Sequence, residues 1–312
     1  MQKTILFFCS LLVIIFQSCT SGNRKNTISI SGAWALYPLT VRWAEEYRKI
    51  HPEVRIDISA GGAGKGIADV LGGLVEIGMV SREINPEELK KGALPVAVAK
   101  DAVVAVVNEK NPVLPDLLAR GLSVEAGINI WITGNYKTWG EITGNKSGLQ
   151  VNVYTRSDAC GAAEIWASLF GKRQEDLLGI GVYGDPGLAQ AVMHDPAGIG
   201  FNNIGYVYDS YTRTPIPGIK IVPLDLDKTG RIEESERFYN SMEDIINAID
   251  SGIYPSPPSR ELYFVLNGMP GNNRVLKDFV EWVLTAGQKF VTAAGYVPLP
   301  PETIAMGLKH LE

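Results

Sequence analysis

Arg156 stands where a short strand pattern meets a helix start, an arrangement that could bind an anion. The segment Val153–Trp166, VYTRSDACGAAEIW, reads as an apolar strand ending at Arg156, a turn of small residues, and a helix that begins at Gly161. The first N–H groups of a helix lack partners within the helix and carry partial positive charge. A guanidinium beside them adds a planar set of donors suited to oxyanions. The segment therefore predicts an oxyanion site, and we expect Arg156→Ala to abolish anion binding with the fold intact.

Three earlier segments of the chain are also turns or loops at the end of a predicted strand. They are the turn Ser31–Pro38, the glycine-rich turn Ala60–Ile67 and the loop Gly78–Arg82, and each follows a predicted strand. Glycine allows the backbone to approach a ligand closely. Ligands of open α/β sheets bind where strands end and helices begin. We therefore expect these segments to line one cleft together with Arg156.

Other polar residues near these turns have alternative interpretations. Asp158 could orient Arg156 or cap the helix at Gly161, and we expect capping. Asp185-Pro186-Gly187 is expected to be only a turn. Asn202-Asn203 could face the cleft, whereas Lys65 and Arg82 could either add charge to it or lie on the surface as solvated cations.

Alternating strands and helices must position these turns. Strand patterns at 27–31, 54–59, 75–81 and 95–108 alternate with helical ones, which favours an α/β lobe with a largely parallel sheet. A second α/β series follows a crossover at Asn111–Pro115. We predict a two-lobed chain, with 27–108 plus 265–312 as lobe 1 and 109–264 as lobe 2. The apolar strands Val103–Val107 and Tyr263–Val265 are the expected crossings between lobes.

The N-terminus has the pattern of an export signal. Lys3 precedes the apolar run Ile5–Phe16, and Ser18-Cys19 is followed by a polar run. The run is short for a membrane span. It resembles a bacterial lipoprotein signal, with residues 1–19 as the signal, 20–26 as a polar tether and Cys19 as the lipidated residue. The alternative is a secretory signal cut near Ser18. Either predicts an exported protein, periplasmic or at the cell surface, and the anchor would attach it to a membrane.

Composition and charge exclude several classes of protein. The 312 residues are 46% hydrophobic and carry a formal net charge of -5 without a basic run, so we expect a globular chain that binds no nucleic acid. The three histidines are scattered, and Ser81 and Cys160 lack a nearby general base. We therefore expect no enzyme activity, no metal site and no cofactor. Cys160 has no cysteine partner outside the signal and is expected to be buried.

Several motifs together resemble a known family. They are GAWALYPLTVRWAEEY at Gly32–Tyr47, GGAGKGIADVLGGLVEIGMVSREI at Gly61–Ile84, TRSDACGAAEIW, RELYFVLNG at Arg260–Gly268 and WVLTAGQKFVTAAGYVPL at Trp282–Leu299. The chain resembles the solute-binding proteins of phosphate-type ABC transporters, in the periplasmic-binding-protein-like superfamily. The resemblance implies a type II two-lobed fold, each lobe a mixed sheet flanked by helices, with a ligand cleft between the lobes. It also implies a monomer that closes on phosphate or a related oxyanion and docks on an ABC permease in the inner membrane.

The same resemblance assigns ligand-binding positions by motif. They are Trp34, Ala35, Ala63, Gly64, Ser81, Arg156, Cys160, Gly161 and Ala162. The family prefers side-chain hydroxyls at Trp34, Ala63, Cys160 and Ala162, which have none, although the Cys160 thiol is a weak donor and the Trp34 indole could donate one hydrogen bond.

These departures leave several alternatives open. The cleft could hold phosphate mainly through backbone N–H groups and Arg156, or another small anion such as an organic acid. A second class is a cell-surface sensor or scaffold with a degenerate binding-protein fold. A third and weaker one is a secreted hydrolase.

Overall fold

A computed structural model describes residues 26–312 of the chain. The predicted signal at 1–19, the proposed lipid site Cys19 and nearly all of the tether lie outside the described residues. Among residues 26–312, none of the helices combines the length and the apolar character that a membrane crossing requires.

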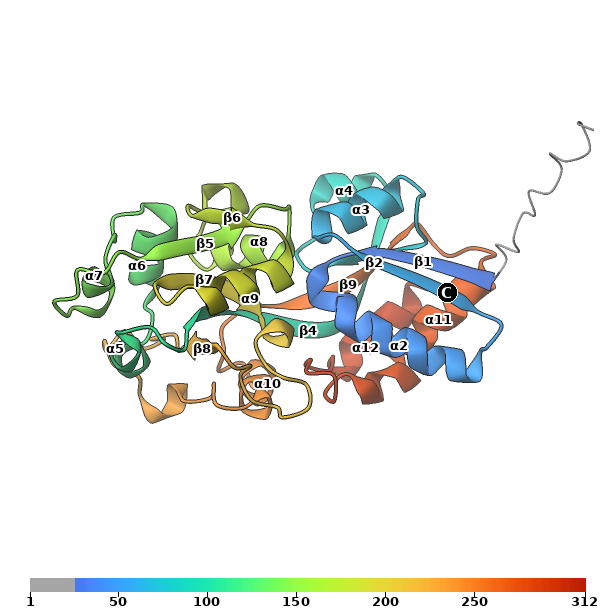
Figure 1. Cartoon of the computed structure of the whole chain (residues 1–312). Coiled ribbons are helices and arrows are strands. Elements are labelled where there is room, and N and C mark those ends of the chain that lie inside the picture. The colour runs from blue at the N-terminus through green and yellow to red at the C-terminus, as the bar shows by residue number, and fades with distance from the viewer. Residues whose placement is uncertain (1–25) are drawn as a thin grey trace, which may run out of the picture.

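The described strands form one hydrogen-bonded series in the order β2-β1-β3-β9-β4-β7-β5-β6, with β8 also paired to β4. In chain order, they are β1 Thr27–Gly32, β2 Arg55–Ala60, β3 Ile77–Val80, β4 Ala93–Asn108, β5 Asn152–Arg156, β6 Ile180–Val182, β7 Gly198–Asn203, β8 Ile219–Val222 and β9 Ser259–Asn267. The long strand β4 pairs with β9 along its first part and with β7 and β8 along its second. It therefore links two halves of the molecule, as Figure 1 shows.

In the first lobe β1 lies parallel to β2 and β3, and β9 runs antiparallel to β3 and β4. The helices that accompany these strands are α2 Tyr37–Ile50, α3 Ala63–Leu71, α4 Pro86–Lys90, α11 Arg274–Leu284 and α12 Pro301–Lys309. In α2, Pro38 occupies the first turn, and Leu39, Trp43 and Tyr47 recur at four-residue spacing on the buried face. That stripe packs α2 against the sheet, while a short helical turn, η3 at Trp34–Leu36, leads into it.

In the second lobe β5 is parallel to β6 and β7, and β4 is antiparallel to β7 and β8. Its helices are α5 Leu114–Arg120, α6 Val124–Gly127, α7 Trp139–Thr143, α8 Gly161–Ser168, α9 Gly184–His194 and α10 Met242–Asp250. Trp131, Trp166 and Phe201 pack their rings together at centroid distances of 5.3 to 6.3 Å. This aromatic cluster anchors α8 on the sheet, which fixes where its N-terminus lies.

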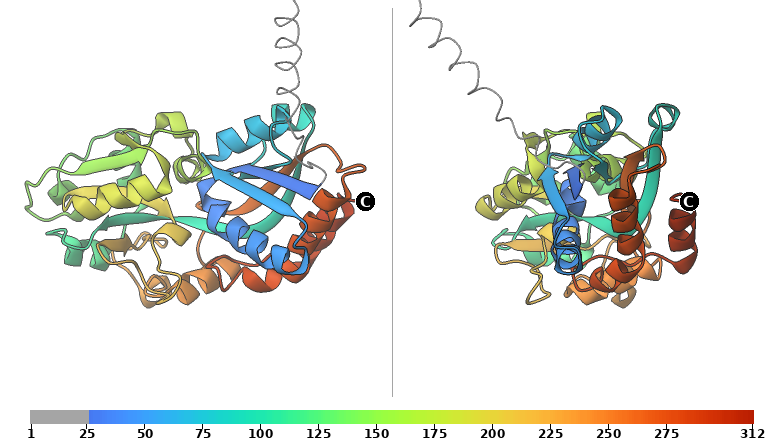
Figure 2. Two further views of the ribbon diagram at one scale, coloured as in Figure 1. Left: turned by 45° about the vertical axis from the view of Figure 1, so that its right-hand side comes forward. Right: turned by 90° about the vertical axis from the view of Figure 1, so that its right-hand side faces the viewer.

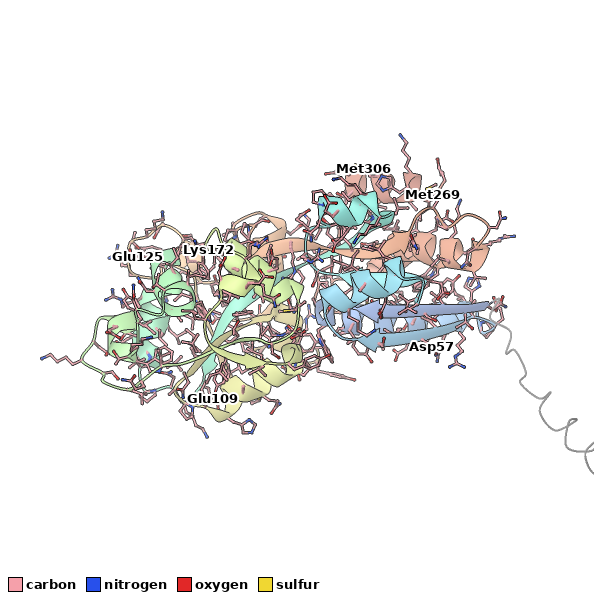
Figure 3. All side chains as sticks on the ribbon, turned by 90° about the horizontal axis from the view of Figure 1, so that it is seen from above. Asp57, Glu109, Glu125, Lys172, Met269 and Met306 are labelled. Carbon is pink, nitrogen blue, oxygen red and sulfur yellow. The ribbon has the colours of Figure 1, made fainter. Side chains whose placement is uncertain are left out.

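Buried apolar side chains form two clusters that correspond to the two lobes. One contains residues of β1, α2, α3, β9 and α11, and the other contains residues of α8, α9, β7, β8 and α10. Along β4 the change from one cluster to the other falls between Ala99 and Ala102. Figure 2 shows the C-terminal helices beside the N-terminal strands, and Figure 3 shows side chains filling both lobes, with Glu125 and Lys172 on one and Asp57 and Met269 on the other. The predicted boundaries of the lobes, 27–108 plus 265–312 for the first and 109–264 for the second, stay a prediction.

Candidate functional site

The four sequence segments expected to line a cleft meet where the two lobes touch. The Gly64 N–H at the start of α3 donates to the Ala159 carbonyl, at 3.1 Å, just before α8. A β-carbon built on Gly161 would lie only 2.0 Å from the Ser81 carbonyl oxygen and 2.3 Å from its Oγ. Glycine at position 161 therefore allows the first turn of α8 to approach the end of β3.

Trp34 and Ala35 join the same contact region from η3. The Tyr206 hydroxyl, from the second lobe, donates to the Trp34 carbonyl at 2.8 Å, and the Tyr296 hydroxyl donates to the Ala35 carbonyl at 2.7 Å. The Trp34 ring meets Tyr183 edge-on at a centroid distance of 6.3 Å. Its indole Nε1 is buried and has no hydrogen-bond partner within residues 26–312. Trp34 therefore contributes an aromatic contact across the lobes and an unused donor.

Arg156 lies at the end of β5, and its side chain is only 1% exposed. Its Nε and Nη2 donate to the two carboxylate oxygens of Asp158 at 2.9 and 2.7 Å, and Nη1 donates to Asp185 at 2.7 Å. Burial lowers the pKa of the guanidinium because it disfavours the charged form. The carboxylates of Asp185 and Asp158 have a larger and opposite effect, so the pKa is raised overall. Three of its five N–H donors are used, so two remain.

Asp158 orients Arg156 and does not cap α8, so the expectation of capping was wrong. Cys160 is the N-cap residue, and its Sγ accepts from the Ala163 N–H at 3.4 Å. Asp158 points the other way because its carboxylate is held by the guanidinium and by the Gly184 N–H at 3.2 Å. A charge-assisted bidentate pair is stronger than one cap hydrogen bond.

The sequence predicted that Asp185 is only part of a turn, but the structure places it beside Arg156. It lies in the first turn of α9, is 1% exposed, and accepts a hydrogen bond from the Asn203 side chain as well as from Arg156. The Asn202 side chain donates to the Asp185 backbone carbonyl at 2.9 Å. The sequence predicted that Asn202-Asn203 could face the cleft; in the structure both side-chain amides donate to Asp185. A signal for Asp185 was its place after a short strand and at a helix start.

A second buried arginine, Arg260, was not singled out by the sequence. Its Nη1 donates to the Gly161 carbonyl at 3.1 Å, Nη2 donates to the Asn203 side-chain oxygen, and Nη2 lies 3.5 Å from Asp101 Oδ2. Asp101 and Arg260 face each other directly across β4 and β9, where the chain passes between the lobes. Burial raises the pKa of the Asp101 carboxyl to about 7, although the Arg260 charge opposes this. Burial also lowers the pKa of Arg260.

Several backbone donors at the helix starts of this region have no protein acceptor in the described part of the chain. Within residues 26–312, no protein acceptor is found for four N–H groups at the starts of η3, α3 and α8, which belong to Ala35, Ala63, Gly161 and Ala162. Ser81 is 2% exposed and is the one residue among the predicted positions that brings a hydroxyl. Burial raises the pKa of the Cys160 thiol to about 12, so Cys160 is a neutral side chain here.

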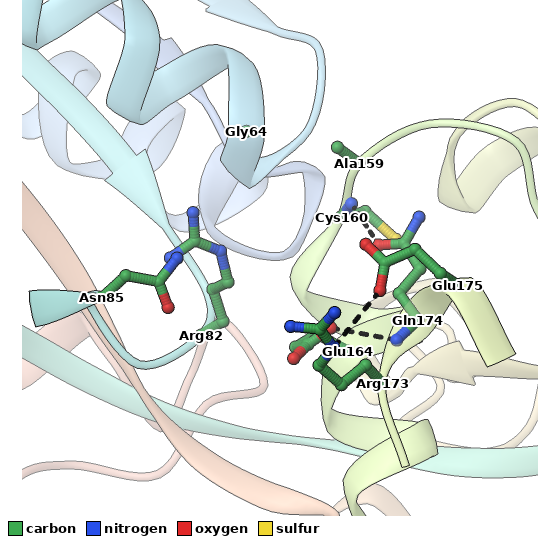
Figure 4. A pocket seen from close by; sticks show the side chains of 9 residues that line it. All are labelled: Gly64, Arg82, Asn85, Ala159, Cys160, Glu164, Arg173, Gln174 and Glu175. Carbon is green, nitrogen blue, oxygen red and sulfur yellow. Dashed lines mark hydrogen bonds and ion pairs between the residues drawn. The ribbon is translucent and has the colours of Figure 1, made fainter. Parts of the chain in front are cut away.

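A small cavity of about 250 Å³ lies at this contact region, with lining residues from both lobes (Figure 4). Of the predicted residues, Gly64 and Cys160 line it, whereas Trp34, Ser81 and Arg156 do not. Arg82 lies opposite Glu164 and Arg173 in Figure 4, but its guanidinium is already paired with Glu88 at 2.7 Å. Lys65 is paired with Asp69 on the surface of α3. These two cations therefore belong to local ion pairs.

Comparison with known proteins gives the family. A family described as "PBP superfamily domain" matches residues 18–286 of this sequence. The chain belongs to this family. The prediction of a two-lobed α/β binding-protein fold is thereby confirmed.

Individual relatives and structures agree with this assignment. The Phosphate-binding protein PstS of Pseudomonas aeruginosa is 29% identical, over 93% of this chain and 88% of its own length. Protein SphX of Synechocystis is 24% identical, over 96% of this chain and 86% of its own. The crystal structure of an ABC-type phosphate transport receptor from Vibrio cholerae superposes with a TM-score of 0.62 at 21% identity, covering 88% of this chain and 100% of that one. The resemblance to phosphate-type binding proteins seen in the sequence motifs is therefore confirmed.

Proposed function

We propose that this chain is an extracytoplasmic solute-binding protein of an ABC importer, and that it binds phosphate or a similar small oxyanion between its lobes. The names of the similar proteins support phosphate as the first candidate. The single observation that carries the proposal is that the starts of α3 and α8 meet next to the end of β5, which holds Arg156, and that the N–H groups of Ala63, Gly161 and Ala162 there have no acceptor within residues 26–312. Helix N-termini and the two unused N–H groups of the Arg156 guanidinium together form a donor-rich site that matches an oxyanion.

Closure of the two lobes supplies the mechanism. The donors of Ala35 and Ala63 belong to the first lobe, whereas those of Arg156, Gly161 and Ala162 belong to the second. An anion that contacts both sets binds the closed arrangement better than an open one and so shifts the population toward closure. The closed form would then be the one that docks on the permease.

The charges around Arg156 favour one kind of oxyanion. Two arginines, Arg156 and Arg260, lie among three aspartates, Asp101, Asp158 and Asp185. A doubly charged anion enters this cluster against more repulsion than a singly charged one, and few hydroxyls are present to compensate. A singly charged phosphate, another monoanionic oxyanion or a small carboxylate therefore fits better than a dianion.

The binding experiment is calorimetric titration of the exported chain with phosphate, sulfate, molybdate and small carboxylates. Gly161→Ala tests the closed cleft, because its β-carbon would meet the Ser81 backbone. The matched control is Gly148→Ala, whose β-carbon has no neighbour within 4 Å. We expect at least one oxyanion to bind the wild type and the control, and about tenfold or weaker binding by Gly161→Ala, since a clash under 3 Å forces the lobes apart.

Two results would contradict the proposal. If Gly161→Ala and Gly148→Ala bound the anion with equal affinity, the anion would bind somewhere other than the contact between the lobes. Binding of no member of the panel, together with recovery of a membrane protein by cross-linking, would favour the sensor or scaffold. Arg156→Ala is a poorer test than the sequence suggested, because it would leave two buried carboxylates without their cation.

Attachment to a membrane through Cys19 and a monomeric state are part of the same proposal. The apolar run before Cys19 and the polar run after it support a lipidated cysteine. We expect Cys19→Ser to move the protein from the membrane fraction to the soluble fraction, with unchanged anion binding. Retention of the Cys19→Ser protein in the membrane fraction would contradict the lipid anchor. Light scattering should give the mass of one chain.

A further inference from the structure

The segment that follows β8 has the residue spacing of a calcium-binding loop. Residues Asp225–Glu236 read DLDKTGRIEESE. The twelve-residue loop of calcium-binding EF-hands has oxygen side chains at positions 1, 3 and 5, glycine at 6 and glutamate at 12. Here these positions are Asp225, Asp227, Thr229, Gly230 and Glu236. Thr229 departs from the Asp or Asn usual at position 5 but still offers an oxygen.

The three carboxylates of this loop converge in the structure. Oxygens of Asp225, Asp227 and Glu236 lie within 4.8 Å of one another. Asp225 is 6% exposed and Glu236 is 3% exposed, while Asp227 lies at the surface. Such a separation is suitable for one cation with ligand distances of about 2.3–2.6 Å.

No cationic side chain of residues 26–312 pairs with these carboxylates, although two are more than nine-tenths buried. The neighbouring arginines are paired elsewhere: Arg231 with Glu233 at 2.6 Å, and Arg237 with Glu234 at 3.6 Å. Buried carboxylates without a counter-charge are costly, and proteins normally pair them or use them to coordinate a metal. This lack of a counter-ion is independent of the sequence spacing, and it indicates a cation between Asp225 and Glu236.

The hydrogen bonds of these carboxylates leave room for a metal ion. Asp225 accepts from the Thr229 and Gly230 N–H groups, each at 3.1 Å. One oxygen of Glu236 accepts from the Leu226 N–H at 2.6 Å and from the Asp227 N–H at 3.3 Å, and the other accepts from the Glu233 N–H at 3.0 Å. A carboxylate has about four lone-pair positions, so about two stay free on Asp225 and about one, on Oε2, stays free on Glu236. These bonds fix the orientation of the carboxylates and leave at least one oxygen lone pair on each for a cation.

The other positions of the loop fit the same assignment. Gly230 has a φ of +75°, which glycine adopts without strain at the sharp turn. The Thr229 hydroxyl donates to the Arg231 carbonyl at 3.0 Å, so the oxygens of positions 5 and 7 lie side by side. Position 8, Ile232, is buried.

The loop is held by α5 and the residue pair that follows it. The Asp225 N–H donates to the Leu122 carbonyl at 3.1 Å, and the Ile232 N–H donates to the Ala119 carbonyl at 2.8 Å. Both attachments lie in the second lobe, at α5 or just after it, where Figure 1 labels that helix. The ligand positions are therefore arranged before an ion binds, which reduces the conformational cost of binding.

We propose that Asp225–Glu236 binds one Ca²⁺ ion, with Asp225, Asp227 and Glu236 as its charged ligands and with Thr229 and the Arg231 carbonyl as neutral ones. Calcium accepts six to eight oxygen ligands in flexible geometry, whereas magnesium requires a near-ideal octahedron, so this loop selects calcium. The inference is independent of the proposed anion site. It contradicts the sequence-based expectation of no metal, which considered the histidines and not this spacing.

The test combines calorimetric titration with CaCl₂ or MgCl₂ and thermal unfolding of the full chain in chelator or in calcium. For the wild type we expect one ion per chain, a dissociation constant in or below the range of about 10⁻⁴–10⁻³ M typical of extracellular modules, and a higher Tm in calcium. Asp227→Asn should weaken calcium binding by about tenfold or more because it removes a charged ligand. Because Asp227 is exposed, its Tm in chelator should match the wild type.

The matched control is Glu234→Gln, which removes the same charge from the same loop at a position that is not a ligand. The Glu234 side chain is 94% exposed. It should bind calcium as the wild type does. Absence of binding at about 10 mM calcium, an equal response to magnesium, or an equal loss in Glu234→Gln would each overturn the proposal. None of these outcomes depends on anion binding, so the two proposals fail separately.

Discussion

Two buried arginines lie near the contact between the lobes, and their surroundings differ. Arg156 makes three hydrogen bonds of 2.7 to 2.9 Å, all to carboxylate oxygens. Arg260 donates to two neutral oxygens, meets Asp101 only at 3.5 Å, and leaves its Nε without a partner within the described chain. One guanidinium is therefore fully compensated, and the other is compensated incompletely.

The difference follows from where the two side chains are anchored. Arg156, Asp158 and Asp185 all belong to the second lobe, where β5 and α9 hold them in fixed positions. Arg260 comes from β9 in the crossing, and it links Asp101 of β4 to Gly161 of α8. A group held within one lobe can reach ideal ion-pair geometry. Arg260 must contact groups on two strands and on one helix at once, so it cannot reach ideal geometry with all of them. We infer that Arg260 connects the strands that cross between the lobes to the start of α8.

The largest expected effect comes from removing each arginine. Arg156→Met should lower the free energy of unfolding by about 3–5 kcal/mol, because it leaves Asp158 and Asp185 buried without a cation. Arg260→Met should cost less, about 1–3 kcal/mol, because Asp101 can take up a proton when it loses its partner. Urea denaturation of both variants measures the difference. A larger loss for Arg260→Met would reverse the comparison.

A smaller effect should appear in the pH dependence of stability. Burial raises the pKa of the Asp101 carboxyl to about 7 in the folded chain, from its ordinary value of 3.8. The folded state therefore binds more protons than the unfolded state between these values, and the stability from this group is lost as pH rises through about 7. We expect the Tm to fall between about pH 5 and about pH 8.

Asp101→Asn provides the comparison for that pH profile. Because asparagine does not titrate, the fall in Tm over the same range should become shallower, whatever the absolute stability of the variant. Asp57→Asn, on the exposed face of β2, is the control and should keep the wild-type slope. An unchanged slope in Asp101→Asn would show that Arg260 compensates Asp101 as fully as Arg156 is compensated.

The smallest expected effect concerns Cys160, which lies beside the Arg156 site. Cys160→Ser replaces a weak donor with a hydroxyl where the resembled family prefers one, so an oxyanion should bind about fivefold more tightly, as one added hydrogen bond allows. Cys160→Ala is the control, which removes the thiol and adds no donor. Calorimetry with the anion that binds best measures both. Equal affinities in the two variants would place the ligand away from the start of α8.

The sequence by itself determined the local parts of this protein. Strand and helix periodicity fixed the alternating α/β elements, the start of α8 at Gly161 and the position of Arg156 at the end of β5. These features depend on residues close together in the chain, so short patterns contain them. The spacing of the oxygen-bearing residues in Asp225–Glu236 is also local, so the sequence alone contains it.

Only the tertiary structure decided which residues compensate the buried charges. Asp185 lies 29 residues from Arg156, and Arg260 contacts Gly161 across 99 residues. Nothing in the composition of a turn or a strand identifies such partners, because they are selected by the packing of β9 and α9 around the contact between the lobes. The sequence thus predicted where Arg156 lies, at the end of a strand. Only the fold brings the carboxylate of Asp185 to it, because ion pairs depend on distance in space and not along the chain.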